Sequence, residues 1–147
     1  MTNKKTTYLI WFVIVCQLLT GVFHSISLFV DPAPKNETEK QLLGLMNDYH
    51  MPDGMGFNPS FSSLFLALSA CFSLLCFMGA WINVYLLRKK IAVDIVKGLM
   101  RIQVFIFAAC FAMMALFTFL PPVICTGLIF AGCLASYVTA THKNHSA

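Results

Sequence analysis

Apolar positions along this chain gather into four long runs that contain almost no ionisable residue. The runs cover residues 8–30, 61–87, 102–120 and 121–140. The last two meet at Pro121-Pro122, a pair that disfavours a continuous helix. As a helix, each run is long enough to cross about 30 Å of hydrocarbon. The pattern therefore predicts an all-α integral membrane protein, a four-helix bundle that forms a single transmembrane domain over residues 1–147.

The segment between the first two runs, residues 31–60, has a different pattern. Apolar residues recur there at intervals of three and four, which places them on one face of a helix. These residues are Leu42, Leu45, Met46 and Tyr49. Asn36 is suited to be the N-cap of this helix, with Glu39 three residues later as in a capping box. We therefore expect a short amphipathic helix at about 36–50, in the headgroup layer or on the end of the bundle.

Composition supports a membrane location. The chain has 147 residues, of which 59% are hydrophobic and 11% charged, whereas soluble domains average about 25% charged residues. A water-soluble fold of this length could not bury so much apolar surface, so the lipid bilayer is the expected partner. The first run exceeds the usual signal-peptide core of about 7–15 residues, and we expect it to be a retained span.

The distribution of charge predicts the orientation. Eight of the ten basic residues lie before the first span, between the second and third, or after the fourth. Five of the six acidic residues lie in the segment 31–60. Because short cytoplasmic segments are enriched in Lys and Arg, we predict cytoplasmic termini, a cytoplasmic inner loop at 88–101 and an outer loop at 31–60. In a bacterium the membrane would be the inner, or plasma, membrane. The basic residues form no nucleic-acid patch, and no nucleic-acid partner is expected.

Among the four spans, the first carries the polar face that is best suited to ligand binding or proton transfer. Gln17, His24 and Asp31 recur at helical spacing, and polar residues within spans usually face inward. His24 is the only histidine within a span, and histidine titrates at about pH 6.5. With His50 of the outer loop, these residues are our candidates for ligand binding or proton handling. The alternative is a neutral, structural His24 bonded to a neighbouring helix or to the outer loop.

No metal or other cofactor is expected. A metal site needs three or four converging ligands, and a haem held by two histidines would need one in a second span. The six cysteines all lie within the expected spans and contain no C-x-x-C pair. We interpret them as small apolar residues at helix contacts rather than as redox or zinc ligands.

Small residues in the second and fourth spans recur at helical intervals. The expected packing residues are Ser69, Ser73, Gly127, Ala131 and Ala135, and a second row in the fourth span is formed by Gly132, Ser136 and Ala140. Such rows let helices approach closely in a bilayer. We interpret them as packing surfaces, and a narrow polar path through the bundle is the alternative.

These features predict a small multi-span membrane protein of undetermined biochemical role that binds a lipophilic small molecule at a polar site near the outer face. One alternative is an accessory or assembly subunit without a ligand site, which associates with another membrane protein or with its own copies. A second alternative is a membrane-embedded enzyme or proton-coupled carrier that uses His24. Catalysis is less favoured, because the sequence has no nucleophile elbow and no phosphate-binding glycine loop. The ligand hypothesis predicts a cavity lined by Gln17, His24 and Asp31, and the subunit hypothesis predicts an accessible row of small residues.

Overall fold

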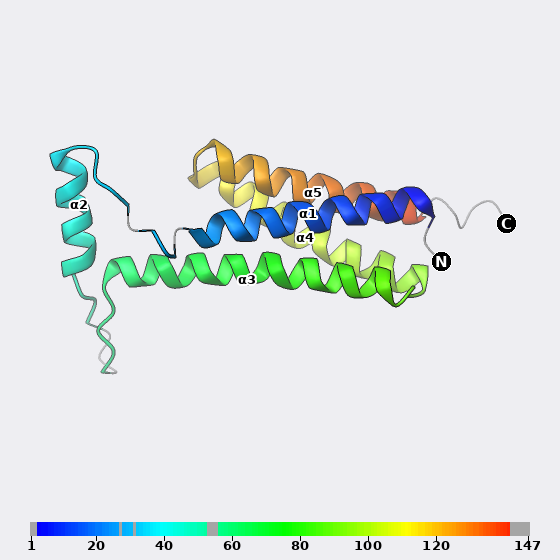
Figure 1. Ribbon diagram of the computed structural model, residues 1–147, viewed down its shortest axis with the longest axis horizontal. Coiled ribbons are helices and arrows are strands. Elements are labelled where there is room, and N and C mark those ends of the chain that lie inside the picture. Colours follow the sequence, from blue (N-terminus) through cyan, green and yellow to red (C-terminus); the bar gives the residue numbers. More distant parts are fainter. Residues whose placement is uncertain (1–2, 27, 31, 53–55, 142–147) are drawn as a thin grey trace. The chain divides into compact units, whose positions relative to one another are not determined.

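The computed structural model describes residues 3–26, 28–30, 32–52 and 56–141. Over these residues it contains five helices and no strand. The helices are α1 (Lys4–Ile26), α2 (Glu37–Asp48), α3 (Phe61–Arg88), α4 (Val93–Phe117) and α5 (Leu120–Thr141), which Figure 1 shows in chain order. All but α2 are long and apolar enough to cross a membrane. The prediction of an all-helical chain with four candidate spans is confirmed.

Helix α2 begins where the capping residues predict. The Oδ1 atom of Asn36 accepts a hydrogen bond from the backbone N–H of Glu39 at 2.8 Å. The carboxylate of Glu39 accepts one from the N–H of Lys35 at 2.6 Å, one residue further back than in a capping box. The apolar face of this helix is left open: Leu45 and Tyr49 are 67% and 59% exposed. Its amphipathic pattern is therefore present, and none of the residues of α2 is buried.

The ends of the long helices follow from side-chain chemistry. Helix α3 begins at Phe61 because the Ser60 hydroxyl oxygen accepts a hydrogen bond from the N–H of Ser63 at 3.2 Å, as an N-cap does. Helices α4 and α5 are joined by a turn at Thr118 and Phe119. The Pro121-Pro122 pair thus lies in the first turn of α5, where a missing N–H leaves no intrahelical bond unmade.

Helix α4 extends further toward its N-terminus than the apolar run indicates. It begins at Val93 and includes most of the segment that we expected as the inner loop, 88–101. The reason is packing, since Val96 and Met100 of this extension are 1% and 0% exposed. The connection between α3 and α4 is therefore short.

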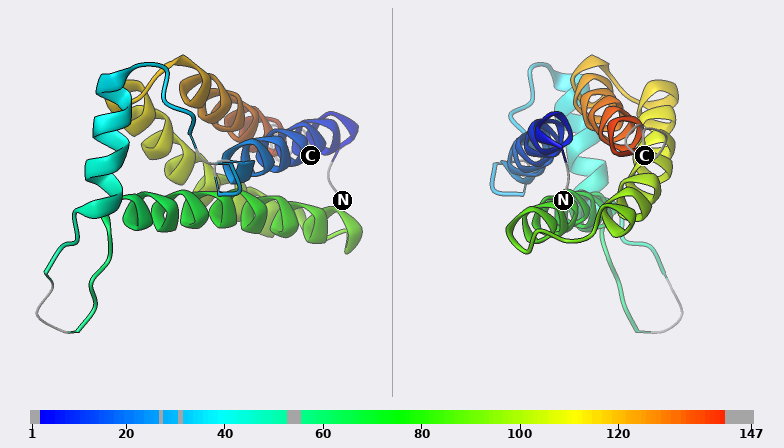
Figure 2. Two further views of the ribbon diagram at one scale, coloured as in Figure 1. Left: turned by 60° about the vertical axis from the view of Figure 1, so that its left-hand side comes forward. Right: turned by 90° about the vertical axis from the view of Figure 1, so that its right-hand side faces the viewer.

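The chain forms two compact units, each described here by itself. One contains Met1–Thr20 and Cys76–Ala147, and the other contains Gly21–Leu75. In the first unit, parts of α1 and α3 lie beside α4 and α5, as the end-on view in Figure 2 shows. Its largest apolar cluster consists of Ile10, Ile14, Ala80, Leu86, Val96 and Met100. That the whole chain forms one membrane domain stays a prediction.

Two contacts of the first unit place the beginning of α1 beside the end of α5. The hydroxyl of Thr6 donates a hydrogen bond to that of Thr139 at 3.1 Å. The side-chain amide of Asn3 donates to the backbone carbonyl of Thr139 at 3.4 Å. The first residues of α1 and the last residues of α5 therefore lie at the same end of this unit, as an even number of antiparallel spans requires.

Candidate functional site

The inward face of α1 is set by polar and branched residues at intervals of three and four. Its members are nearly inaccessible to solvent: Thr6, Ile10, Val13, Ile14, Gln17 and Thr20. The larger apolar residues between them, among them Trp11 and Leu19, stay exposed. The spacing that predicted an inward polar face for the first span thus corresponds to burial, and it puts the side chain of Gln17 in the interior of the first unit.

Three carboxamide side chains from three helices meet there, and we call them the amide cluster: Gln17 of α1, Asn83 of α3 and Gln103 of α4. Gln17 Nε2 donates to Gln103 Oε1 at 2.9 Å. Asn83 Nδ2 donates to Gln17 Oε1 at 3.0 Å and to Gln103 Oε1 at 3.1 Å. Gln103 Nε2 donates back to Asn83 Oδ1 at 2.8 Å. The three side chains form a closed ring of hydrogen bonds.

The amide cluster satisfies its own polar groups. All three carbonyl oxygens accept at least one hydrogen bond, and both N–H groups of Asn83 are used. Asn83 and Gln17 are 0% exposed and Gln103 is 7% exposed. In the described part of the chain, the only buried side-chain nitrogen or oxygen without a partner is the hydroxyl of Ser73, outside this cluster. Each amide nitrogen and oxygen of the cluster therefore has at least one partner inside the cluster.

A glycine makes room for the cluster. A Cβ atom added at Gly79 would lie 2.5 Å from Nε2 and 3.1 Å from Cδ of Gln17. Real carbon atoms do not approach a neighbour so closely, so any larger residue at this position would displace the Gln17 amide. Gly79 is thus part of the arrangement that holds Gln17 against Asn83 and Gln103.

The amide cluster can hold helices in position but cannot transfer protons. Carboxamides are hydrogen-bond donors and acceptors without a proton to exchange near neutral pH, so the cluster offers no general acid or base. Hydrogen bonds between helices in a bilayer contribute on average about 0.6 kcal/mol, and up to about 1.7 kcal/mol. A ring of four bonds across three helices is therefore suited to fix their relative rotation and depth.

The other predicted polar candidates lie elsewhere. His24 belongs to the second unit, where its half-buried ring stands edge-on to Phe72 with centroids 5.0 Å apart and planes at 76°. Asp31 lies outside the described residues. His50 is exposed, and its Nδ1 donates to the backbone carbonyl of Asn58 at 2.7 Å. Together with the bond from Met51 N–H to Pro59 O at 3.0 Å, this contact closes the loop before α3.

Metal binding has no geometric support in the part of the chain that the structure describes. Within it, no three side chains of His, Cys, Asp or Glu come together as ligands. The hydrogen bond of the His50 ring is to the backbone carbonyl of Asn58 rather than to another potential ligand. No residue is therefore assigned to a cofactor or metal.

The predicted packing residues differ in how far they are buried. Ser73 is buried and Ser69 half-buried, whereas Gly127 and Ala135 are half-buried and Ala131 is exposed. The row that is buried in α5 is the second one, Gly132, Ser136 and Ala140. A Cβ atom at Gly132 would lie 2.8 Å from Cγ2 of Val13, so this row is the close contact between α5 and α1. The first row remains partly accessible.

Sequence reasoning identified Gln17 but not the partners that define its role. Asn83 and Gln103 are visible in the sequence as polar residues on otherwise apolar helices, yet nothing in their spacing shows that they meet. The available signal is depth: Gln17 lies six residues after Trp11, and Asn83 five residues before Arg88. Trp and Arg mark a membrane interface, so the two amides lie at similar distances from it.

Comparisons of the chain with protein-family models, with curated proteins and with solved structures find no match.

Proposed function

We propose that this chain is a multi-pass integral membrane protein with both termini in the cytoplasm, and that it acts as an accessory or assembly subunit of a larger membrane complex. Four helices of sufficient length and apolarity support the membrane location. The excess of Lys and Arg at the termini and between α3 and α4 supports the orientation. The position of the beginning of α1 beside the end of α5 is consistent with it.

The amide cluster is the observation that carries the subunit role. A ligand site on the inward face of α1 would need the Gln17 side chain to be accessible, and it is 0% exposed. Its carbonyl oxygen and its amide nitrogen are instead bonded to Asn83 and Gln103. The interior polar groups thus hold the helices together. The chain can therefore contact a partner only through its exposed surface, which includes the side of the helices that faces lipid.

That outer surface has features of a contact surface. Ala131 is exposed on α5 between the half-buried Gly127 and Ala135, so another helix could approach closely there. Lipid can cover this row too, but small residues offer lipid tails little contact area and offer a second helix a close approach.

Native electrophoresis in mild detergent, after cross-linking in the membrane, tests the subunit role. We expect the wild-type chain to migrate in an assembly larger than the monomer. Ala131→Leu should shift it toward the monomer, whereas Ala109→Leu, a matched change at an exposed alanine of α4, should not. Both variants should keep the wild-type thermal midpoint. A wild-type chain that is monomeric before and after cross-linking would contradict the proposal.

A ligand site near the outer face is the second candidate. Its support is that His24 is half-buried, with an aromatic neighbour in Phe72, which is compatible with a partly open polar site. In the source organism, His24→Ala should then abolish the phenotype that depends on this protein while leaving its amount in the membrane unchanged. Parallel loss of the protein itself would instead identify His24 as structural.

A further inference from the structure

The end of α3 has an unusual backbone. Lys90 has a φ of 48° and is the only residue other than glycine with a positive φ in the described part of the chain. The N–H of Ile91 bonds to the carbonyl of Leu86 at 3.3 Å, and that of Lys90 to the carbonyl of Leu87 at 3.4 Å. This is the Schellman pattern of a helix C-terminus, in which the left-handed position is usually glycine. A lysine there is strained, and it places a cation directly after the helix.

A cavity of about 260 Å³ lies beside this turn. Its lining residues all belong to the first unit: Thr7, Trp11, Leu86, Leu87, Arg88, Lys90, Ile91 and Val96. Five of these are apolar or aromatic, and two are cations. Pockets for small ligands are about 300–1,000 Å³, so this one holds part of a larger molecule rather than a whole cofactor.

The cations of this cavity have no counter-ion among the residues that the structure describes. The ion pair within the described residues is that between Lys40 and Glu37 on α2, at 3.7 Å, and neither Arg88 nor Lys90 takes part in one. Asp94 is the one acidic residue of the chain outside the segment 31–53, and it too forms no ion pair among the described residues. Two positive charges thus line a largely apolar cavity and form no ion pair within the described part of the chain.

We infer that this cavity binds the head group of an anionic phospholipid of the cytoplasmic leaflet. Arg88 and Lys90 would bond the phosphate, and Trp11 with the apolar wall would contact the glycerol and the first acyl carbons. Free inorganic phosphate shares the anionic chemistry, but it would leave the apolar wall without a partner. Lys and Arg at a membrane surface attract anionic lipid, and Trp is favoured at this depth. The inference rests on the proposed membrane insertion.

Fluorescence of Trp11 in reconstituted bilayers tests this inference. The chain has two tryptophans, Trp11 and Trp81, so Trp81→Phe leaves Trp11 as the only one. In phosphatidylcholine vesicles, a minor fraction of phosphatidylglycerol with brominated acyl chains should quench Trp11 more than the same fraction of brominated phosphatidylcholine does. Each of Arg88→Gln and Lys90→Gln should lower this preference about tenfold, because each variant loses a hydrogen bond between a charged side chain and the phosphate.

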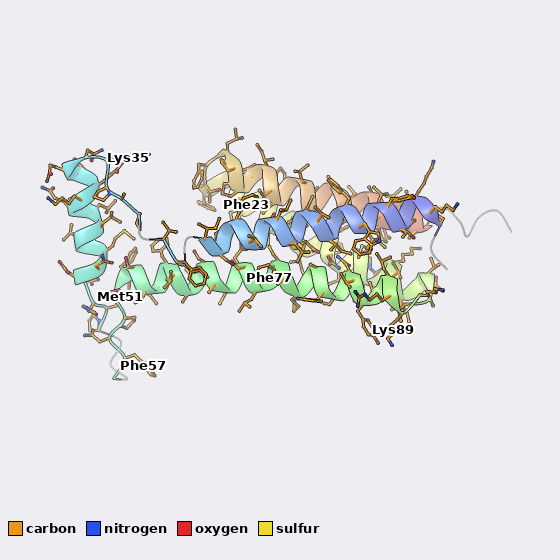
Figure 3. The ribbon with its side chains drawn as sticks, viewed as in Figure 1. Phe23, Lys35, Met51, Phe57, Phe77 and Lys89 are labelled. Carbon is orange, nitrogen blue, oxygen red and sulfur yellow. The ribbon has the colours of Figure 1, made fainter. Side chains whose placement is uncertain are left out.

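Lys89→Gln is the matched control. Lys89 belongs to the same basic segment but does not line the cavity. Figure 3 shows it at the end of α3. Neutralising it should leave the phosphatidylglycerol preference close to that of the wild type. Equal losses for all three variants would reduce the effect to general surface charge and overturn a specific site.

Lys90→Gly separates binding from folding. Glycine adopts the left-handed conformation without strain, so this variant should unfold at the same or a higher temperature. It should nevertheless lose the lipid preference as Lys90→Gln does. A variant that keeps the preference would overturn the role of the Lys90 ammonium group.

Two further outcomes distinguish the alternatives. Sodium phosphate, compared with sodium chloride at equal ionic strength, should not reduce quenching by brominated phosphatidylglycerol. A reduction specific to phosphate would assign the site to the free anion instead of the lipid. If the wild type floats with vesicles but shows no head-group preference, the lipid site is disproved and the proposed membrane insertion stands.

Discussion

At the scale of single residues, hydrogen bonding determines which polar side chains can be buried in the first unit. A buried amide without a partner costs free energy, and apolar surroundings offer no replacement. Gln17, Asn83 and Gln103 avoid that cost only by meeting one another. Each amide is therefore tolerated because the other two are present, and the three should respond to substitution as one unit.

Substitution of the amide cluster should be strongly non-additive. Asn83→Leu removes the partners of Gln17 Oε1 and of Gln103 Nε2, and should lower the free energy of unfolding by about 1–3 kcal/mol. Replacing all three amides by Leu or Met leaves no polar group unpaired, so the triple variant should lose less than the sum of the single variants. Unfolding in mixed detergent micelles measures both. A triple variant that loses the full sum would show that the amides act independently.

Gly79→Ala should be destabilising through Gln17. The added carbon would lie 2.5 Å from the Gln17 amide nitrogen, and overpacking of this kind costs about 1–3 kcal/mol. The same change at Gly98, where nothing lies within 4 Å, should be neutral or stabilising, because alanine favours helix. If crowding is the cause, Gly79→Ala should cost less when Gln17 is already alanine. A cost that does not depend on residue 17 would refute this explanation.

At the scale of elements, the sequence predicts what local chemistry decides. The cap at Asn36 determines where α2 begins. Pro121-Pro122 lies in the first turn of α5, just after the connection at Thr118 and Phe119, so the beginnings of both helices can be predicted without a structure. The beginning of α4 at Val93 was predicted only in part. Residues 91–101 have the pattern of an amphipathic segment at the membrane surface, but this pattern does not show that Val96 and Met100 are buried. Burial there depends on a neighbour, which hydrophobic spacing does not reveal.

Helix α2 has an open apolar face that should contact lipid at the membrane surface. Leu45 lies on that face and is 67% exposed, and Asn47 lies on the polar side. An environment-sensitive fluorophore should therefore emit at shorter wavelength at position 45 than at position 47 once the protein is in bilayers. As a control, the fluorophore is attached at either position of an isolated α2 peptide in buffer without detergent. It should then emit at the wavelength that it has in water at both positions. Identical emission from the two positions in bilayers would mean that the face is not in the headgroup layer.

At the scale of the whole molecule, pairing between helices is the information that the sequence lacks. The polar residues of spans one, two and three are evident, but their meeting depends on the rotation and depth of each helix. The same holds for α5, where two rows of small residues look equivalent. Only the row with Gly132 is buried against α1, near Val13, while Ala131 stays exposed. The sequence of one helix at a time therefore shows that Gln17 faces inward but does not show that it meets Asn83 and Gln103.

Orientation is the property of the whole molecule that charge predicts most directly. With cytoplasmic termini, short epitope tags at residues 1 and 147 should be inaccessible to an impermeant reagent in intact cells, and a tag inserted after Gly44 in α2 should be accessible.

Exchanging Arg88 and Lys89 for Gln removes two of the positive charges that hold the connection between α3 and α4 inside. A fraction of molecules should then insert with altered topology, whereas Lys35→Gln with Lys40→Gln, on the outer side, should not increase that fraction. Tags at the two ends that report opposite sides of the membrane would exclude an even number of spans, and with it the antiparallel arrangement in which the beginning of α1 bonds the end of α5.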